Sequence, residues 1–175
     1  MKIYTGKEDQ KISTQELVET MSESLENNGN ILYMDNFYTS ISLFQSLREK
    51  KIRCTGTIRK NRIKSKNILA DFAKSKDGDY KFYTNYPQSD LTLLLWKDKR
   101  EVFFLSNHRD TSLDEIEFEE NGMNSKKFIP SIRNHYNEKC RGVDKTNQLC
   151  KTFRYDHVQK KWWKSLFEQV IQINL

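Results

Sequence analysis

The sequence predicts a mixed α/β fold with a partly parallel sheet. Two helical patterns and two strand patterns alternate along residues 13–59, in the order helix, strand, helix, strand. Parallel strands need a long crossover connection, which is usually a helix, so this order favours parallel pairing of the two strands. Further strand patterns follow over residues 80–105, and helical spacing returns from Pro130 onward.

The first helix and the strand after it have clear local signals. Ser13 and Glu16 form a capping-box pattern, and Gly29 is a suitable stop. Between them, apolar residues recur at helical spacing: Leu17, Val18, Met21 and Leu25. Residues 31–34 are consecutively apolar, which predicts a short strand buried on both faces of a sheet.

The second helix and strand follow directly. The helix is expected to begin near Thr39 or Ser40, and its inner face is expected to contain Ile41, Phe44 and Leu47. Residues 53–59 predict the next strand.

The second half of the chain begins with a turn at residues 77–79 and a strand at 80–84. Residues 91–96 and 101–105 predict the two arms of a hairpin. Residues 110–120 are acidic and are interpreted as a loop. Near the C-terminal end, Trp162 and Trp163 belong to an apolar stripe at helical spacing, so we interpret them as core residues rather than as base-stacking groups.

Charge and cysteine usage narrow the class of protein. Lys and Arg number 30 against 24 Asp and Glu, and this net charge of +6 favours a polyanionic partner. Cys54, Cys140 and Cys150 are widely spaced and form no metal knuckle, so reduced thiols in an intracellular protein are expected. No apolar run approaches the roughly 18 residues of a membrane span, so no membrane partner is expected.

Two aspartates are candidates for chemistry. Asp35 directly follows the strand at 31–34, and ligand sites of open α/β sheets gather at the carboxyl ends of strands. The alternative for Asp35 is an ordinary cap or turn residue. Asp144 follows Gly142 and shares a helix face with Gln148. Spacing alone favours a simpler role for Asp144, in the first turn of a helix where the dipole stabilises a carboxylate.

A basic run extends over residues 48–66. It contains a single acidic residue, Glu49. Its basic residues are Arg48, Lys50, Lys51, Arg53, Arg59, Lys60, Arg62, Lys64 and Lys66. Such density beside an aspartate that could bind a metal would suit a phosphate backbone, because each neutralised phosphate releases counterions. A solvated basic loop explains the composition equally well.

Several stretches together resemble the piggyBac-type transposases. They occur in that family's order, from residues 4–7 to the C-terminal end: residues 34–40 with Leu43 and Phe44, 55–62, 96–99 with Val102 and 105–106, Pro130 with Ile132 and 136–137, 142–144 with Gln148, and 161–163 with Phe167. No single stretch is specific, but the ordered set is.

The resemblance implies an RNase H-like catalytic core in which three aspartates hold two Mg²⁺ ions for DNA strand cleavage and transfer. Asp35 matches the second aspartate and Asp144 the third. Residues 1–63 would form part of the core, 64–125 a β-rich insertion, and 126–175 the helical part that carries Asp144. The residues implied to contact transposon-end DNA are Arg59, Lys60, Asn61, Arg62 and Lys64. Nuclear localisation follows from the same resemblance.

The chain departs from the family pattern in two ways. The family's first aspartate belongs upstream of the match at residues 4–7, so we expect an incomplete core without its N-terminal strands, weak or absent Mg²⁺ binding, and no activity of the chain alone. Asn147 stands where the family usually has another acid. Two alternatives remain open: a domesticated, non-catalytic domain that binds DNA or protein, and a longer active transposase whose start lies before Met1. A second copy of the chain or a full-length relative is a candidate partner.

Overall fold

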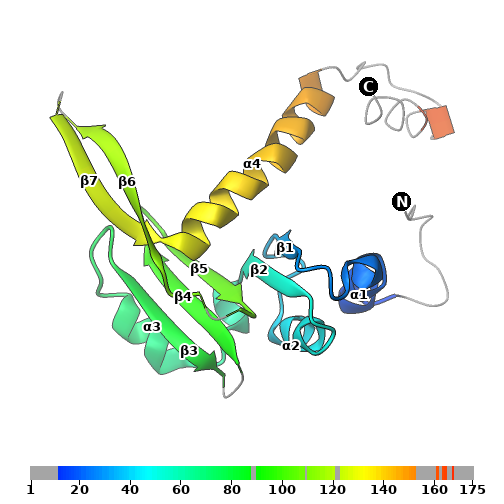
Figure 1. Ribbon diagram of the computed structural model, residues 1–175, viewed down its shortest axis with the longest axis horizontal. Helices are drawn as coiled ribbons and strands as arrows, with labels where there is room; N and C mark the ends of the chain where they lie inside the picture. Colours follow the sequence, from blue (N-terminus) through cyan, green and yellow to red (C-terminus); the bar gives the residue numbers. More distant parts are fainter. Residues whose placement is uncertain are drawn as a thin grey trace. The chain divides into compact units, whose positions relative to one another are not determined.

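The computed structural model describes residues 12–87, 90–108, 110–120 and 123–152, together with Lys161, Trp163, Lys164 and Phe167. The chain divides into two compact units, Met1–Tyr136 and Asn137–Leu175. The first unit combines helices with a mixed sheet, so the predicted α/β class is confirmed (Figure 1).

The helices of the described residues are α1 (Thr14–Ser22), α2 (Ile41–Glu49), α3 (Lys66–Phe72) and α4 (Ser131–Thr152), with short 3-10 helices at Glu23–Leu25 and Lys60–Arg62. The strands are β1 (Ile31–Met34), β2 (Arg53–Thr57), β3 (Tyr80–Tyr86), β4 (Leu91–Lys97), β5 (Glu101–Ser106), β6 (Leu113–Glu120) and β7 (Met123–Pro130). The predicted helix starts are confirmed: the Ser13 hydroxyl accepts the Glu16 amide at 3.1 Å, and the Ser40 hydroxyl accepts the Leu43 amide at 3.2 Å.

Five strands form one sheet in the order β1-β2-β5-β4-β3. β1 and β2 are parallel, as predicted, and α2 connects them. The other three pairings are antiparallel, and β4 and β5 form the predicted hairpin. Because β2 pairs directly with β5, the sheet crosses the predicted boundary between residues 63 and 64.

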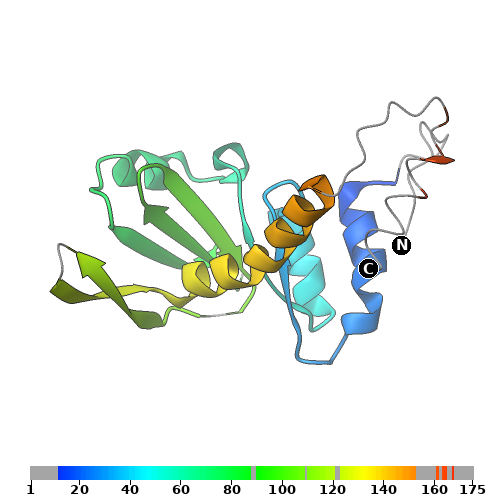
Figure 2. The ribbon, with the colours of Figure 1, turned by 90° about the horizontal axis from the view of Figure 1, so that it is seen from above.

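The sheet is buried on both faces. One face packs against α1, α2 and α3 around Phe44, Phe72 and Leu93, and the other packs against β7 and the start of α4 around Trp96 and Ile132. Figure 2 shows α3 on one side of the sheet and the β6–β7 ribbon on the other. β4 runs between the two clusters, so its side chains are buried on both faces.

β1 is less buried than its sequence predicts. Only Met34 of its four residues is fully buried, and the other three are half-buried. The strand lies at the end of the strand order of the five-stranded sheet, so its apolar run meets neighbours on fewer sides than a central strand does.

The interpretation of residues 110–120 as a loop was wrong. β6 covers most of this segment and pairs with β7 in antiparallel register, with Glu117 opposite Lys126. Lys126 Nζ lies 3.0 Å from a carboxylate oxygen of Glu115, so cross-strand charge pairing offsets the acidic composition. The alternation of Glu115 and Glu117 with Ile116 was the strand signal that the charge obscured.

A carboxylate on β6 accepts hydrogen bonds from the first residues of α4. Asp114 of β6 accepts hydrogen bonds from the hydroxyl of Ser131, the first residue of α4, and from Asn134 Nδ2 at 2.7 Å. Partial burial raises the pKa of Asp114, but the two hydrogen bonds and the charge of His135 together outweigh burial, so the pKa is lowered below its ordinary value.

We expect acid to weaken this junction. Since the pKa of Asp114 is lower in the folded chain than in the unfolded one, its stabilising contribution is present above the unfolded pKa, about 4, and is lost as the pH falls through the folded pKa. The contribution is about 1 kcal/mol. Urea unfolding at pH 6 and pH 3 measures this contribution. In Asp114→Asn, the free energy of unfolding should differ less between the two pH values than it does in the unchanged chain. An unchanged difference in Asp114→Asn would contradict the assignment.

The second unit contains the remaining residues of α4, which are exposed along almost their whole length. Trp163 is 49% exposed, so the prediction of a core position was wrong for this residue, and Trp162 lies outside the described residues. Phe167 of the same apolar stripe is 62% exposed. Helical spacing of apolar residues indicates a face that can be buried, but not the element that buries it. No helix in the described ranges is both long enough and apolar enough to span a bilayer.

Candidate active site

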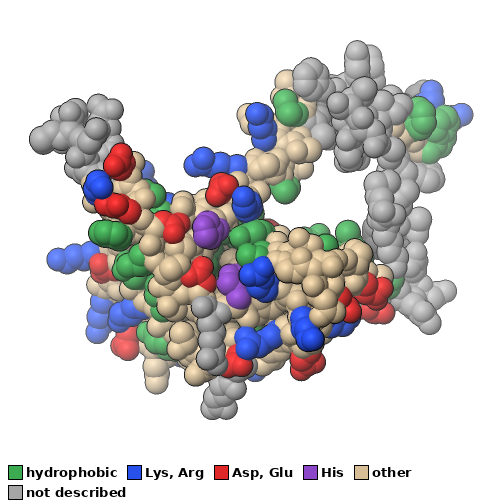
Figure 3. Space-filling model, viewed as in Figure 1, with side chains coloured by type: hydrophobic (Ala, Val, Ile, Leu, Met, Phe, Trp, Pro, Cys, Tyr) green, Lys and Arg blue, Asp and Glu red, His purple; other side chains and the backbone are tan. Residues whose placement is uncertain are grey.

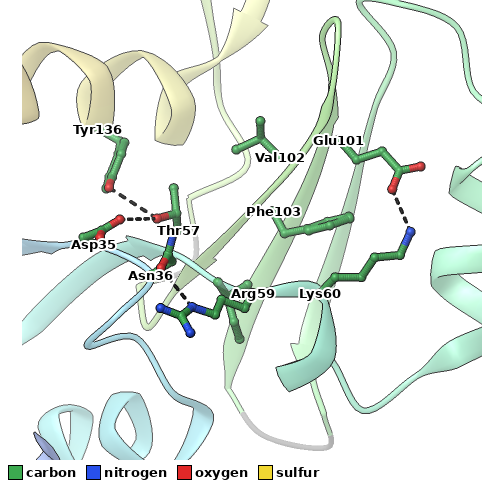
Figure 4. A pocket seen from close by; sticks show the side chains of 10 residues that line it. Asp35, Asn36, Thr57, Arg59, Lys60, Glu101, Val102, Phe103 and Tyr136 are labelled. Carbon is green, nitrogen blue, oxygen red and sulfur yellow. Dashed lines mark hydrogen bonds and ion pairs between the residues drawn. The ribbon is translucent and has the colours of Figure 1, made fainter.

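Asp35 lies where β1 ends, and its carboxylate is exposed. Met34 is in register with Gly56 of the parallel strand β2, so the residues that follow them, Asp35 and Thr57, emerge at the same edge of the sheet. The Thr57 hydroxyl donates to Asp35 Oδ1 at 3.4 Å, and the Tyr136 hydroxyl lies 3.4 Å from the same Thr57 oxygen (Figure 4).

A pocket of about 580 Å³ opens beside this row of hydroxyls. Its walls come from the carboxyl end of β1, from the segment after β2, from β5 and from the first turns of α4, and the lining residues are Asp35, Asn36, Thr57, Ile58, Arg59, Lys60, Glu101, Val102, Phe103 and Tyr136. Figure 4 shows Asp35, Thr57 and Tyr136 on one side of the pocket, with Lys60 and Glu101 on the other.

The loop after β1 is held by hydrogen bonds to its own backbone. The Asp35 carbonyl accepts the amides of Tyr38 at 3.0 Å and Thr39 at 3.2 Å, and also the Thr39 hydroxyl at 3.1 Å. The Thr39 side chain is fully buried. Ser40 then caps α2, so the segment from Asp35 to Ser40 turns tightly from strand into helix.

Gly56 makes this turn possible. A Cβ atom at this position would lie 2.6 Å from the Met34 carbonyl oxygen and would overlap the Thr39 hydroxyl. Only a residue without a side chain therefore lets β2 approach both β1 and the loop.

Arg62 supports the same loop from outside. Its Nη1 donates to the carbonyl oxygens of Asn36 at 2.9 Å and Thr39 at 2.6 Å, and also lies 3.4 Å from that of Phe37. Arg59 Nε donates to Asn36 Oδ1 at 3.0 Å. Two guanidinium groups thus fix the segment that follows Asp35.

On the opposite side of the pocket from Asp35, Lys60 pairs with Glu101, with Nζ 2.8 Å from the carboxylate. The hydrogen bond from Lys60 lowers the pKa of Glu101. Glu101 is therefore an ionised partner of Lys60 at neutral pH rather than a proton donor, and the Lys60 side chain remains 56% exposed.

The predicted DNA-contacting residues have unequal environments. Arg59, Lys60 and Arg62 all bind groups of the chain itself. Arg62 is half-buried, whereas the other four residues are exposed. Figure 3 shows basic and acidic side chains interspersed on the face it displays. Charge density in the sequence did not reveal that Arg62 is half-buried against backbone carbonyls, and the role of all five residues as DNA contacts stays a prediction.

Replacing Arg62 by methionine should weaken the loop without unfolding the protein. The variant keeps much of the apolar stem but leaves the Asn36 and Thr39 carbonyls without this donor, which should lower the free energy of unfolding by about 1–3 kcal/mol. Chemical denaturation measures the change. Lys64→Met, which removes an exposed cation from the same segment, is the control and should be nearly neutral. Equal effects of the two substitutions would contradict the support role of Arg62.

Asp144 lies inside α4, in the second unit, and is exposed. The prediction that it occupies the first turn of a helix was wrong, because α4 begins thirteen residues earlier, at Ser131. The glycine at 142 was interpreted as a helix start, but the helix continues through it. That Asp144 and Asp35 share a cation stays a prediction.

The residues around Asp35 suit a hard cation only in part. One carboxylate and the hydroxyls of Thr57 and Tyr136 are oxygen donors of the kind that Mg²⁺ prefers. Within the described ranges, however, no three His, Cys, Asp or Glu side chains gather as a metal site would require. A single carboxylate does not balance two divalent ions, so further carboxylates are needed for the family's two-metal site.

Sequence reasoning missed Thr57 and Tyr136. The rule that identified Asp35 also applies to Thr57, since it too ends a parallel strand, so this residue could have been found. Tyr136 comes from a helix 79 positions further along the chain, and no local pattern predicts its approach.

The cysteines agree with the predicted thiol state where they are described. Cys54 and Cys140 are both free. Burial raises the pKa of Cys54 well above its ordinary value, so this thiol is unreactive, and the side chain of Cys150 lies outside the described part of the chain.

Comparison with known proteins identifies the class. Residues 1–175 match the family model described as Transposase IS4, and the chain belongs to this family. A divalent-metal requirement is general in such transposases. The chain is also similar to a piggyBac transposase, solved by cryo-electron microscopy as a synaptic complex with hairpin DNA, with a TM-score of 0.72 and 25% identity. This match covers 95% of the present chain and 33% of that one, so the chain spans about a third of its length. The resemblance inferred from the sequence motifs is confirmed.

Proposed function

We propose that this chain is the part of a piggyBac-type transposase that carries Asp35 of an RNase H-like core, and that it binds transposon-end DNA at the Asp35 pocket. The observation that carries the proposal is the position of Asp35 at the carboxyl end of β1, above a pocket bordered by Arg59 and Lys60. The similar piggyBac transposase is described in a complex with hairpin DNA, which supports DNA as the partner.

The catalytic role proposed for Asp35 is that of a Mg²⁺ ligand, with Asp144 as the second carboxylate. When bound, Mg²⁺ would activate the attacking oxygen and stabilise the leaving one. The chain's own contribution is positional. Thr57 orients the Asp35 carboxylate, Tyr136 orients Thr57, and Arg62 fixes the backbone that follows.

We further propose that these 175 residues do not cleave DNA by themselves. In the described lining of the pocket, the residues with carboxylates are Asp35 and Glu101, and the Glu101 carboxylate is paired with Lys60. Incubation of the purified chain with Mg²⁺ and a transposon-end duplex should give no strand cleavage or joining. Cleavage that disappears in Asp35→Ala would contradict this part of the proposal while supporting the catalytic role of Asp35.

DNA binding is tested by fluorescence anisotropy with the same duplex at increasing salt. If the basic segment neutralises roughly four phosphates, affinity should fall on the order of a hundredfold between about 50 and 200 mM salt. Affinity that does not change with ionic strength, or the absence of binding, would contradict the proposal. Nuclear localisation is proposed with it, on the net charge of +6 and the DNA partner.

A domesticated, non-catalytic DNA-binding or protein-interaction domain is the second candidate. The observation that favours it is the ion pair between Lys60 and Glu101, because it occupies one of the carboxylates in the pocket lining. The two candidates differ in their dependence on Mg²⁺. A domesticated domain should bind DNA equally with and without Mg²⁺, whereas the transposase role predicts that Mg²⁺ strengthens binding and that Asp35→Ala abolishes this increase.

A further inference from the structure

The loop after β1 holds two aromatic rings out to solvent. Phe37 is 54% exposed and Tyr38 is 39% exposed. Their ring centroids lie 5.1 Å apart with the planes at 84°. In this edge-to-face arrangement only one ring has a face covered by the other, so aromatic faces remain open to a further partner.

The exposure of these rings does not come from a loose backbone. The carbonyl oxygens of Phe37 and its neighbours accept hydrogen bonds from Arg62, and the Tyr38 amide donates to the Asp35 carbonyl at 3.0 Å. Thr39, directly after the pair, is fully buried against Gly56. A tightly held loop that keeps two rings exposed is arranged to present them.

The surroundings of the pair indicate what would bind there. Phe37 lies two residues from Asp35, and the exposed Arg59 side chain reaches Asn36 between them. Exposed aromatic faces and guanidinium planes are the groups on which unstacked nucleobases lie, and a nearby cation attracts the phosphate of the same nucleotide. A base inside an intact duplex already has both faces covered, so the occupant is an unpaired base.

We infer that Phe37 and Tyr38 form a stacking platform for one unpaired base of the DNA, next to the DNA phosphate that faces Asp35. This inference rests on the proposed function, because it requires DNA at the Asp35 pocket. It adds a substrate feature that the pocket alone does not specify: the bound DNA is locally unpaired beside the phosphate that faces Asp35.

Two duplexes of one sequence test the inference, one fully paired and one with a single bulged 2-aminopurine, whose fluorescence falls when it stacks. The chain should bind the bulged duplex about tenfold more tightly and quench its fluorescence. Phe37→Leu should abolish both effects and leave binding of the paired duplex unchanged. Phe128→Leu is the matched control, since Phe128 is 58% exposed on β7, and it should behave as the unchanged chain does.

Each contrary outcome has a distinct meaning. Binding to both duplexes with no preference, or quenching that survives in Phe37→Leu and Tyr38→Leu, overturns the platform and leaves the proposed function intact. Binding to neither duplex overturns both. A change in sedimentation of Phe37→Leu with unchanged base preference would assign the rings to a protein interface instead. Thermal melts verify folding, and two different exposed positions provide the variants in case one does not fold.

Discussion

Gly56→Ala is expected to lower the free energy of unfolding by about 3 kcal/mol and to disturb the Asp35 loop. The added Cβ would lie 2.6 Å from the Met34 carbonyl oxygen and would overlap the buried Thr39 hydroxyl. Neither neighbour can withdraw easily, because Met34 belongs to β1 and Thr39 is fully buried. Overpacking of a well-packed site typically costs about 1–3 kcal/mol, and a clash with backbone belongs at the upper end.

Gly142→Ala is the matched control. Gly142 lies inside α4, and an added Cβ would meet nothing within 4 Å. Alanine is the better helix former by about 1 kcal/mol, so this variant should be slightly more stable than the unchanged chain. Urea unfolding of both variants measures the difference. If both substitutions changed stability in the same direction, the close approach at Gly56 would not be the cause.

Asn107→Leu is the second substitution with a large expected effect, a loss of about 3–4 kcal/mol. The buried Asn107 side chain accepts the Cys54 amide at 2.7 Å and donates to the Ile52 carbonyl at 2.8 Å. It thereby joins the end of β5 to the strand β2. Leucine has a similar size but forms neither hydrogen bond, so it would leave a buried donor and a buried acceptor without these partners.

The control for Asn107→Leu is Asn137→Leu, at an exposed position of α4. This change should alter stability by less than about 0.5 kcal/mol. Guanidinium unfolding and amide hydrogen exchange of β2 provide the measurements, because the Cys54 amide should lose protection in Asn107→Leu alone. Retained protection of this amide would show that the Asn107 hydrogen bond does not hold β2.

Local signals predicted the elements around the site well. The capping serines Ser13 and Ser40, the apolar run before Asp35 and the parallel pairing of β1 with β2 are all present in the structure. Each depends on residues close together in the sequence, where capping chemistry and hydrophobic periodicity act directly.

Long-range arrangements were not predictable from such signals. The sequence indicated a hairpin of β4 and β5 but not that β5 would pair with β2, since strand order depends on packing of the whole sheet. In the same way, the family resemblance implied a DNA contact for Arg62, which stays a prediction, but no sequence signal indicated its contacts within the fold. Its three carbonyl acceptors belong to residues 36–39, more than twenty positions earlier, and only the fold brings them together.

The same division between local signals and tertiary structure applies to the residues of the candidate site. Asp35 was identified because the carboxyl end of a parallel strand is a local feature, and the hydroxyl neighbours Thr57 and Tyr136 required the tertiary structure. The exposure of Phe37 also could not be predicted, because an aromatic residue after a strand is more often buried than presented.

The presence of DNA beside Asp35 is tested most directly by photocrosslinking of the chain to a transposon-end duplex that contains 5-iodouracil, followed by mass spectrometry of the crosslinked peptides. The proposed function predicts crosslinks in residues 35–36 and 59–60, which line the pocket, and their loss at high salt. Crosslinks confined to other segments, such as the β6–β7 ribbon, would contradict the placement of DNA at Asp35.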